Sequence, residues 1–174
     1  MDYLLNAFLF FLPAGIANAS PVFATRIPLL KRFDTPLDFG RSWRGQRIFG
    51  TNKTWRGLLF GTLMGGITSL LVSYFLIPNS ADAWYTFLIG AALGAGALTG
   101  DAVESFLKRR RGIPAGASWF PFDQIDYIIG GLVFVYPLTF IPVILMAGIL
   151  ILYFGLHLLV SYLGYLTGFK STPI

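Results

Sequence analysis

The sequence predicts an all-α, polytopic integral membrane protein with about five transmembrane helices. Of its 174 residues, 55% are hydrophobic and only 12% are charged, whereas a soluble domain carries roughly 25% charged residues. Five apolar segments approach the length of about 20 residues that a helix needs to cross the hydrocarbon core. The 13 Lys and Arg residues lie almost entirely in two of the connecting segments.

The predicted spans form a single transmembrane catalytic domain over residues 1–174. The first segment carries Asp2 where a cleavable signal peptide has basic residues, and it is longer than such a peptide requires, so we expect it to remain as a helix. Pro137 and Pro142 divide the last long apolar stretch into two segments. The five spans are residues 4–25, 58–77, 84–107, 125–138 and 143–168.

The basic residues predict the orientation. Two loops, 26–57 and 108–124, contain nearly all of them, and Lys170 follows the last span. With five spans these places face one side, which the positive-inside rule assigns to the cytoplasm. We therefore expect a multi-pass protein of the cell membrane with its N-terminus outside, its C-terminus cytoplasmic and its active site on the cytoplasmic side.

Four acidic residues fall on that same side, although the positive-inside rule asks nothing of carboxylates. On a continuous helix, positions 101, 104, 105 and 108 share one face. Ionisable residues at the edge of a span usually line a polar cavity, which makes them functional candidates. For Lys108 alone, snorkelling to the interface is the main alternative, and Asp123 alone could be a helix N-cap. The four acids are Asp101, Glu104, Asp123 and Asp126.

Carboxylates that converge beside many cations suggest a hard divalent ion. Magnesium takes oxygen ligands and completes its shell with water and substrate phosphates. Lys and Arg would then hold the remaining phosphate oxygens. The sequence therefore predicts Mg²⁺ as cofactor, with Asp101, Glu104, Asp123 and Asp126 as its candidate ligands.

The stretch "FGTNKTWRG", residues 49–57, precedes the second span. It is not a Walker loop, because Asn52 and Arg47 stand where that motif needs glycines. The amides at the start of the helix can still bind an anion, reinforced by Lys53 and Thr54. Its aromatic and basic residues could contact single-stranded nucleic acid, but anionic lipid headgroups explain them better in a membrane protein, so no nucleic-acid partner is expected.

Small residues recur at four-residue spacing in two of the spans. Gly61 and Gly65 form one pair, and Gly90 and Gly94 form another. Such spacing lets helices approach closely. It leaves two alternatives open, packing inside the bundle or a homodimer.

Two stretches resemble the integral-membrane, CTP-dependent phosphatidate cytidylyltransferases, and in particular their short archaeal relatives, the CDP-archaeol synthases. "GTNKTWRG" is similar to the lysine-threonine box of the bacterial enzymes, with Arg56 in place of a glutamate. "GDAVESFLKRRRGIPAGASWFPFDQID" resembles their terminal signature, without its Lys-Asp and His-Gly-Gly elements. The short loop and small size match the archaeal branch.

The resemblance implies roles for individual residues. It implies catalytic roles for Asp101, Lys108, Asp123 and Asp126. Together with the anion site at the helix start, it predicts a substrate-binding set that comprises Thr51, Asn52, Lys53, Thr54, Arg56, Ser105 and Arg109.

The implied reaction transfers the cytidylyl group of CTP to an isoprenoid ether glycerophosphate of the 2,3-di-O-geranylgeranylglyceryl phosphate type. The products are a CDP-archaeol-type lipid and pyrophosphate, and the partners are CTP, the lipid phosphate and the bilayer. A CTP-dependent isoprenoid lipid kinase is the enzymatic alternative. A small anion transporter is disfavoured because no charge lies near the middle of any predicted span.

Overall fold

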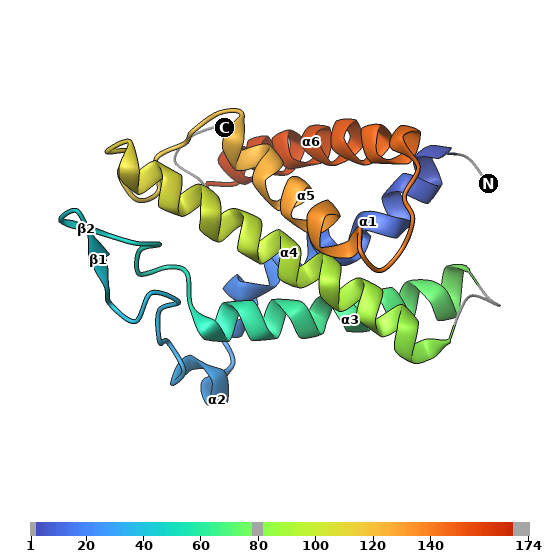
Figure 1. Ribbon diagram of the computed structural model, residues 1–174, viewed down its shortest axis with the longest axis horizontal. Coiled ribbons are helices and arrows are strands. Elements are labelled where there is room, and N and C mark those ends of the chain that lie inside the picture. The colour runs from blue at the N-terminus through green and yellow to red at the C-terminus, as the bar shows by residue number, and fades with distance from the viewer. Residues whose placement is uncertain (1–2, 78–81, 169–174) are drawn as a thin grey trace.

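The computed structural model of the chain describes residues 3–77 and 82–168. In this part, five long helices alternate in direction, so that the start of α1 and the end of α6 lie at opposite ends of the bundle (Figure 1). The helices are α1 (Tyr3–Ala24), α2 (Pro28–Lys31), α3 (Trp55–Leu76), α4 (Ala83–Arg110), α5 (Phe122–Val135) and α6 (Val143–Leu166). The strands are β1 (Ser42–Trp43) and β2 (Gln46–Arg47), which pair in an antiparallel hairpin.

Four of the long helices, α1, α3, α4 and α6, are long and apolar enough to cross a membrane. The fifth, α5, has 14 residues, which corresponds to about 21 Å against a hydrocarbon core of about 30 Å. Pro121 precedes this helix and Pro137 follows it closely, so it cannot extend far in either direction. The five predicted helical segments are therefore present, while four reach spanning length.

The predicted loops 26–57 and 108–124 are both shorter than expected. Helix α3 begins at Trp55, because the hydroxyl of Thr54 caps it by accepting the Gly57 amide at 3.1 Å. Helix α4 continues to Arg110. The first loop also contains α2 and the hairpin, a small departure from the all-α prediction. Figure 1 shows this loop and the α4–α5 connection at the same end of the bundle.

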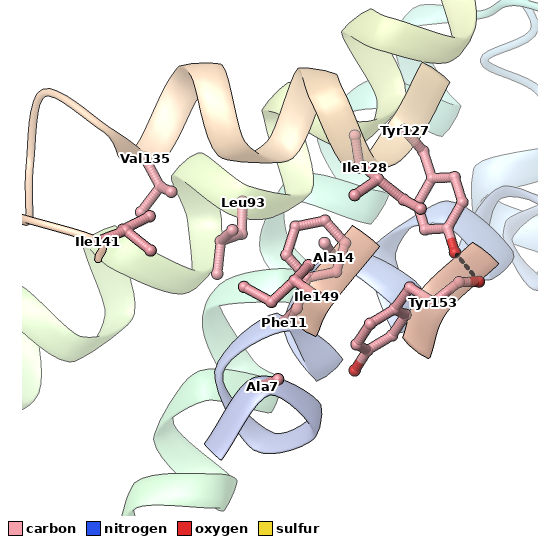
Figure 2. Packing of buried hydrophobic residues seen from close by; sticks show 11 residues of the cluster. Ala7, Phe11, Ala14, Leu93, Tyr127, Ile128, Val135, Ile141, Ile149 and Tyr153 are labelled. Atoms are coloured by element: carbon pink, nitrogen blue, oxygen red, sulfur yellow. Dashed lines mark hydrogen bonds between the residues drawn. The ribbon is translucent and has the colours of Figure 1, made fainter. Parts of the chain in front are cut away.

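The hydrophobic core joins α1, α4, α5 and α6 (Figure 2). The ring of Phe11 packs edge-on against that of Tyr153, with centroids 4.9 Å apart. The Tyr127 hydroxyl donates to the Tyr153 carbonyl at 3.1 Å, and the Tyr153 hydroxyl donates to the Phe8 carbonyl at 2.6 Å. Buried tyrosines thus have their polar ends paired, and they tie α5 and α6 to α1.

The glycine pairs pack α3 against α4 within the chain. A Cβ atom added to Gly65 would lie 2.5 Å from the Gly90 carbonyl oxygen, and one added to Gly94 would lie 3.0 Å from the Gly61 oxygen. Backbones approach this closely only where side chains are absent. The close approach accounts for both pairs inside one chain, and the structure offers no support for the homodimer alternative.

The α3–α4 contact yields a prediction about stability. We expect Gly65→Ala to lower the free energy of unfolding by about 1–3 kcal/mol, because the added methyl group has no room. The matched control is Gly155→Ala, since a Cβ at Gly155 of α6 meets nothing within 4 Å. Unfolding of the purified proteins in detergent measures the difference. Equal stability of the two variants would contradict this account of α3–α4 packing.

Candidate active site

A polar pocket of about 310 Å³ lies where α4, α5 and α6 meet the segment that precedes α3. It contains four carboxylates and three cationic side chains, an unusual concentration for a protein with 12% charged residues. Its lining residues are Phe49, Gly50, Thr51, Asn52, Lys53, Asp101, Glu104, Ser105, Lys108, Arg109, Ala115, Gly116, Asp123, Asp126 and His157.

The last turns of α4 form one wall of the pocket. Asp101, Glu104, Ser105 and Lys108 all line it, which confirms the shared helix face expected from their spacing. Glu104, Ser105 and Lys108 are buried. Because α4 runs without interruption from Ala83 to Arg110, these residues keep regular helical spacing.

Three carboxylates come together at the base of this wall. Asp101, Glu104 and Asp126 each offer an oxygen atom, and these atoms lie within 4.8 Å of one another. Asp126 comes from α5, which passes so close to α4 that a Cβ on Gly100 would collide with the Asp126 carbonyl. The close approach of α4 and α5 at Gly100 therefore brings the three carboxylates together.

The acidic group fits a divalent metal ion. Its donors are all oxygen atoms, which hard cations prefer. Asp101 is paired with Lys53 and Glu104 with Lys108, but Asp126 forms no ion pair within the described residues. Its carboxylate accepts the amide of the adjacent Tyr127 at 2.5 Å. A carboxylate held beside two others in this way still needs positive charge, which a cation at this place would supply.

Asp123 is not one of these three acids, but it lies beside Glu104, with which it shares the ammonium group of Lys108. One of its oxygen atoms is 2.5 Å from the Lys108 Nζ, and the other accepts the Trp119 amide at 2.8 Å. The N-cap alternative for Asp123 is wrong, because Pro121 occupies the cap position and α5 has no side-chain cap. Asp123 instead closes the loop before α5, and its role as a metal ligand stays a prediction.

Lys108 does not snorkel to the interface. Its residue is 8% exposed, and its Nζ lies 2.5 Å from Asp123 and 3.2 Å from Glu104. It therefore bridges α4 and α5. The snorkelling alternative is wrong, because the ammonium group is paired with two carboxylates inside the bundle.

The segment before α3 forms the opposite wall. The Lys53 Nζ lies 2.5 Å from the Asp101 carboxylate, so this loop reaches directly to the acidic group on α4. Thr51 and Asn52 line the pocket beside it, and Arg109 lines it from α4.

Two predicted substrate-binding residues lie outside the pocket. The Thr54 hydroxyl caps α3. The Arg56 guanidinium donates to the carbonyl oxygens of Leu30 and Lys31, at 3.4 and 3.2 Å, and so fastens α2 to the start of α3. The contacts in the structure are thus structural ones for both residues, and their binding role stays a prediction.

His157 lines the pocket and was not among the predicted site residues. It comes from α6, and its ring centroid lies 5.7 Å from that of Tyr127. It is the chain's single histidine and stands on an otherwise apolar helix. A single histidine on such a helix could have indicated a site residue, but His157 lies far in sequence from both motifs.

An apolar groove of about 380 Å³ runs along α4 and α5 and passes the acidic group. Glu104 and Asp126 line both this groove and the polar pocket. The remaining lining is almost entirely apolar and includes Val103, Ile129 and Phe134. The carboxylates therefore stand at the boundary between a polar and a hydrocarbon-like environment.

Asp38 organises the loop that carries Lys53. Its buried carboxylate binds the guanidinium of Arg47 and the amides of Gly40, Phe49 and Gly50. Burial alone would raise its pKa, but the Arg47 hydrogen bond and the three amides outweigh burial and lower the pKa to about 2. Asp38 is thus ionised in any neutral or mildly acidic solution.

The Lys108 bridge yields a prediction about stability. We expect Lys108→Met to lower the free energy of unfolding by about 3 kcal/mol, because Glu104 and Asp123 would be left close together without their shared cation. Lys31→Met is the control, since Lys31 is exposed. Unfolding in detergent at neutral pH measures both variants. A Lys108→Met protein as stable as the control would show that the bridge contributes little.

Asp38 yields a prediction about pH. Its folded pKa of about 2 lies below the ordinary value of 3.8, so the unfolded chain binds more protons between these two values. The stabilisation is fully present above about pH 4 and is lost as the pH falls toward 2. Unfolding midpoints of the parent and of Asp38→Asn should therefore converge over this range. A constant difference between the two proteins across it would contradict the assignment.

Comparison with known proteins shows the family of the chain. The model of the family "CarS-like: CDP-archaeol synthase" matches residues 1–174. The CDP-archaeol synthase of Pyrococcus furiosus is 38% identical over 178 residues, which cover 99% of each chain. That of Thermococcus gammatolerans is 40% identical over 166 residues, which cover 94% of this chain and 92% of the relative.

A solved structure, described as that of an intramembrane enzyme for archaeal membrane lipids biosynthesis, is similar in fold. Its TM-score is 0.75 at 32% identity, over 91% of this chain and 94% of that chain. The two kinds of comparison cover nearly the whole chain, including both walls of the pocket. The chain belongs to the CDP-archaeol synthase family.

Proposed function

We propose that this protein transfers the cytidylyl group of CTP to an isoprenoid ether glycerophosphate of the 2,3-di-O-geranylgeranylglyceryl phosphate type. An oxygen of the lipid phosphate attacks the α-phosphorus of CTP, and the bond from that phosphorus to the bridging oxygen breaks. The products are a CDP-archaeol-type lipid and pyrophosphate. The observation that carries the proposal is the group of three carboxylates between a polar pocket and an apolar groove.

The proposed cofactor is Mg²⁺, held by Asp101, Glu104 and Asp126, with Asp123 as a further candidate ligand. When bound, Mg²⁺ would neutralise phosphate charge and orient the triphosphate. The all-oxygen donor set, and a carboxylate at Asp126 that forms no ion pair among the described residues, support this assignment.

The chain's own residues have a limited chemical task, because the attacking phosphate is already anionic. No strong base is needed, and alignment and charge neutralisation provide most of the catalysis. Lys53 and Lys108 face the acidic group from two directions, and Arg109 lines the same pocket. These three cations would hold phosphate oxygens of the nucleotide and of the lipid.

The groove on α4 and α5 suits the lipid. Its apolar lining would keep an isoprenoid chain in a hydrocarbon environment while the phosphate reaches Glu104 and Asp126, which line both the groove and the polar pocket. Only the headgroup would then have to enter the polar pocket, and the chains would not have to leave the bilayer.

The proposed active site faces the cytoplasm. The pocket is built from the two segments that hold most of the basic residues, and these segments lie at one end of the bundle. The positive-inside rule places such segments on the cytoplasmic side, where CTP is available.

The identity of the products tests the proposal. Purified protein is incubated with Mg²⁺, the ether-lipid phosphate and CTP labelled either at the α- or at the γ-phosphate. We expect α-label in the lipid and release of pyrophosphate. A lipid that acquires γ-label, with CDP released, would establish a kinase instead. CTP that enters protein-containing vesicles without chemical change would establish a transporter.

Asp101→Asn tests the acidic group. We expect the rate of cytidylyl transfer to fall roughly 100-fold or more, because a charged group at the reacting centre would be lost. Asp34→Asn is the matched control, since Asp34 is exposed in the loop before α3. Unfolding in detergent verifies that both variants are folded. Full activity of a folded Asp101→Asn protein would refute the proposed role of this group.

A further inference from the structure

The segment Phe49–Lys53, here called the strap, covers one side of the polar pocket. All five of its residues line the pocket, and it carries Lys53 to the acidic group. The strap ends just before α3, whose packing against α4 fixes that end, whereas its start belongs to a loop without long helices. Contacts within the loop and between the loop and α4 must hold the start in place.

Both ends of the strap are attached to the preceding part of the loop. At its start, Asp38 accepts the amides of Phe49 at 3.0 Å and Gly50 at 3.2 Å. At its end, the Lys53 carbonyl accepts the Leu37 amide at 2.8 Å. The loop is therefore one hydrogen-bonded unit, and moving the hairpin moves the strap.

Arg110, in the last turn of α4, joins this unit to the helix that carries the acids. Its guanidinium donates to three carbonyl oxygens of the β1–β2 hairpin: those of Trp43, of Gln46 at 3.2 Å and of Arg47 at 2.8 Å. The guanidinium also lies over the rings of Trp43 and Phe106, 5.4 and 5.2 Å from their centroids. Figure 1 shows the hairpin beside the end of α4.

Arg47 links the two sets of contacts. Its carbonyl accepts from Arg110, while its side chain binds Asp38 at 2.5 Å, with the Asp38 side chain fully buried. A continuous path of hydrogen bonds therefore runs from α4 through the hairpin to the start of the strap. Arg110 forms no ion pair in the described part of the chain and does not line the polar pocket.

We infer that Arg110 is a positioning residue for the nucleotide. By binding three hairpin carbonyls, it holds the start of the strap against α4, beside the ring contact of Phe49 with Phe106, and so helps to set the width of the site for the triphosphate. This inference rests on the proposed function, because it takes CTP as the ligand of the pocket. Arg110 acts by positioning the strap and not by contacting the nucleotide, because its guanidinium binds the hairpin and does not line the polar pocket.

Two substitutions separate geometry from charge. Arg110→Ala removes both, whereas Arg110→Lys keeps the charge but loses the planar fork that reaches several acceptors at once. Arg44→Ala is the matched control, because Arg44 is an exposed hairpin cation that lies over the same Trp43 ring, at 5.2 Å. Calorimetry measures the binding of Mg–CTP to each protein in detergent, and transfer assays measure KM for CTP and for the lipid separately.

We expect Arg110→Ala and Arg110→Lys to weaken Mg–CTP binding and raise KM for CTP roughly tenfold each, since a misplacement of about 1 Å caused from a distance can cost up to about 100-fold. KM for the lipid and the unfolding midpoint should stay near those of Arg44→Ala. Restoration of CTP binding by lysine would show that charge alone matters and would overturn the inference. An equal change in both KM values, or a general loss of stability, would overturn it as well.

The proposed function and the positioning role of Arg110 can be refuted separately. A parent protein that binds Mg–CTP but transfers no cytidylyl group would refute the proposed function, while the calorimetric comparison would still decide the role of Arg110. A parent protein that binds no CTP would refute both.

Discussion

The mutual repulsion of carboxylates at the edge of the membrane is the constraint on which the rest of this structure depends. Asp101, Glu104 and Asp126 have oxygen atoms within 4.8 Å of one another, and Asp123 lies beside them on Lys108. Such a group is unfavourable unless cations compensate it. Lys108 supplies one from within the bundle, and Lys53 supplies another from the loop before α3.

The backbone packing serves the same group. Glycines let α4 pass very close to α3 on one side and to α5 on the other, so that α4 is at the centre of the bundle. Gly100, the residue before Asp101, meets the backbone of Asp126 where α4 and α5 cross. The residues that allow tight helix packing therefore also bring the acids of two helices together.

The site joins two environments that a soluble enzyme rarely combines. On one side of Glu104 and Asp126 lies a pocket with cations and backbone groups, and on the other lies an apolar groove open along α4 and α5. A water-soluble triphosphate and a membrane lipid can each remain in a suitable solvent while their phosphates meet. The loop that completes the pocket is held by Asp38, which lies outside the two stretches that resemble the family, and by Arg110.

By itself the sequence determined the membrane character of the chain, its helical segments and the helix face that carries Asp101, Glu104 and Lys108, because hydropathy and helical periodicity are local properties. It also pointed to the family through two short motifs. Only the tertiary structure decided that Lys108 is a buried bridge between Glu104 and Asp123, that Thr54 and Arg56 make structural contacts, and that His157 lines the pocket. These outcomes depend on which side chains meet across helices far apart in sequence, and no local pattern specifies such distances.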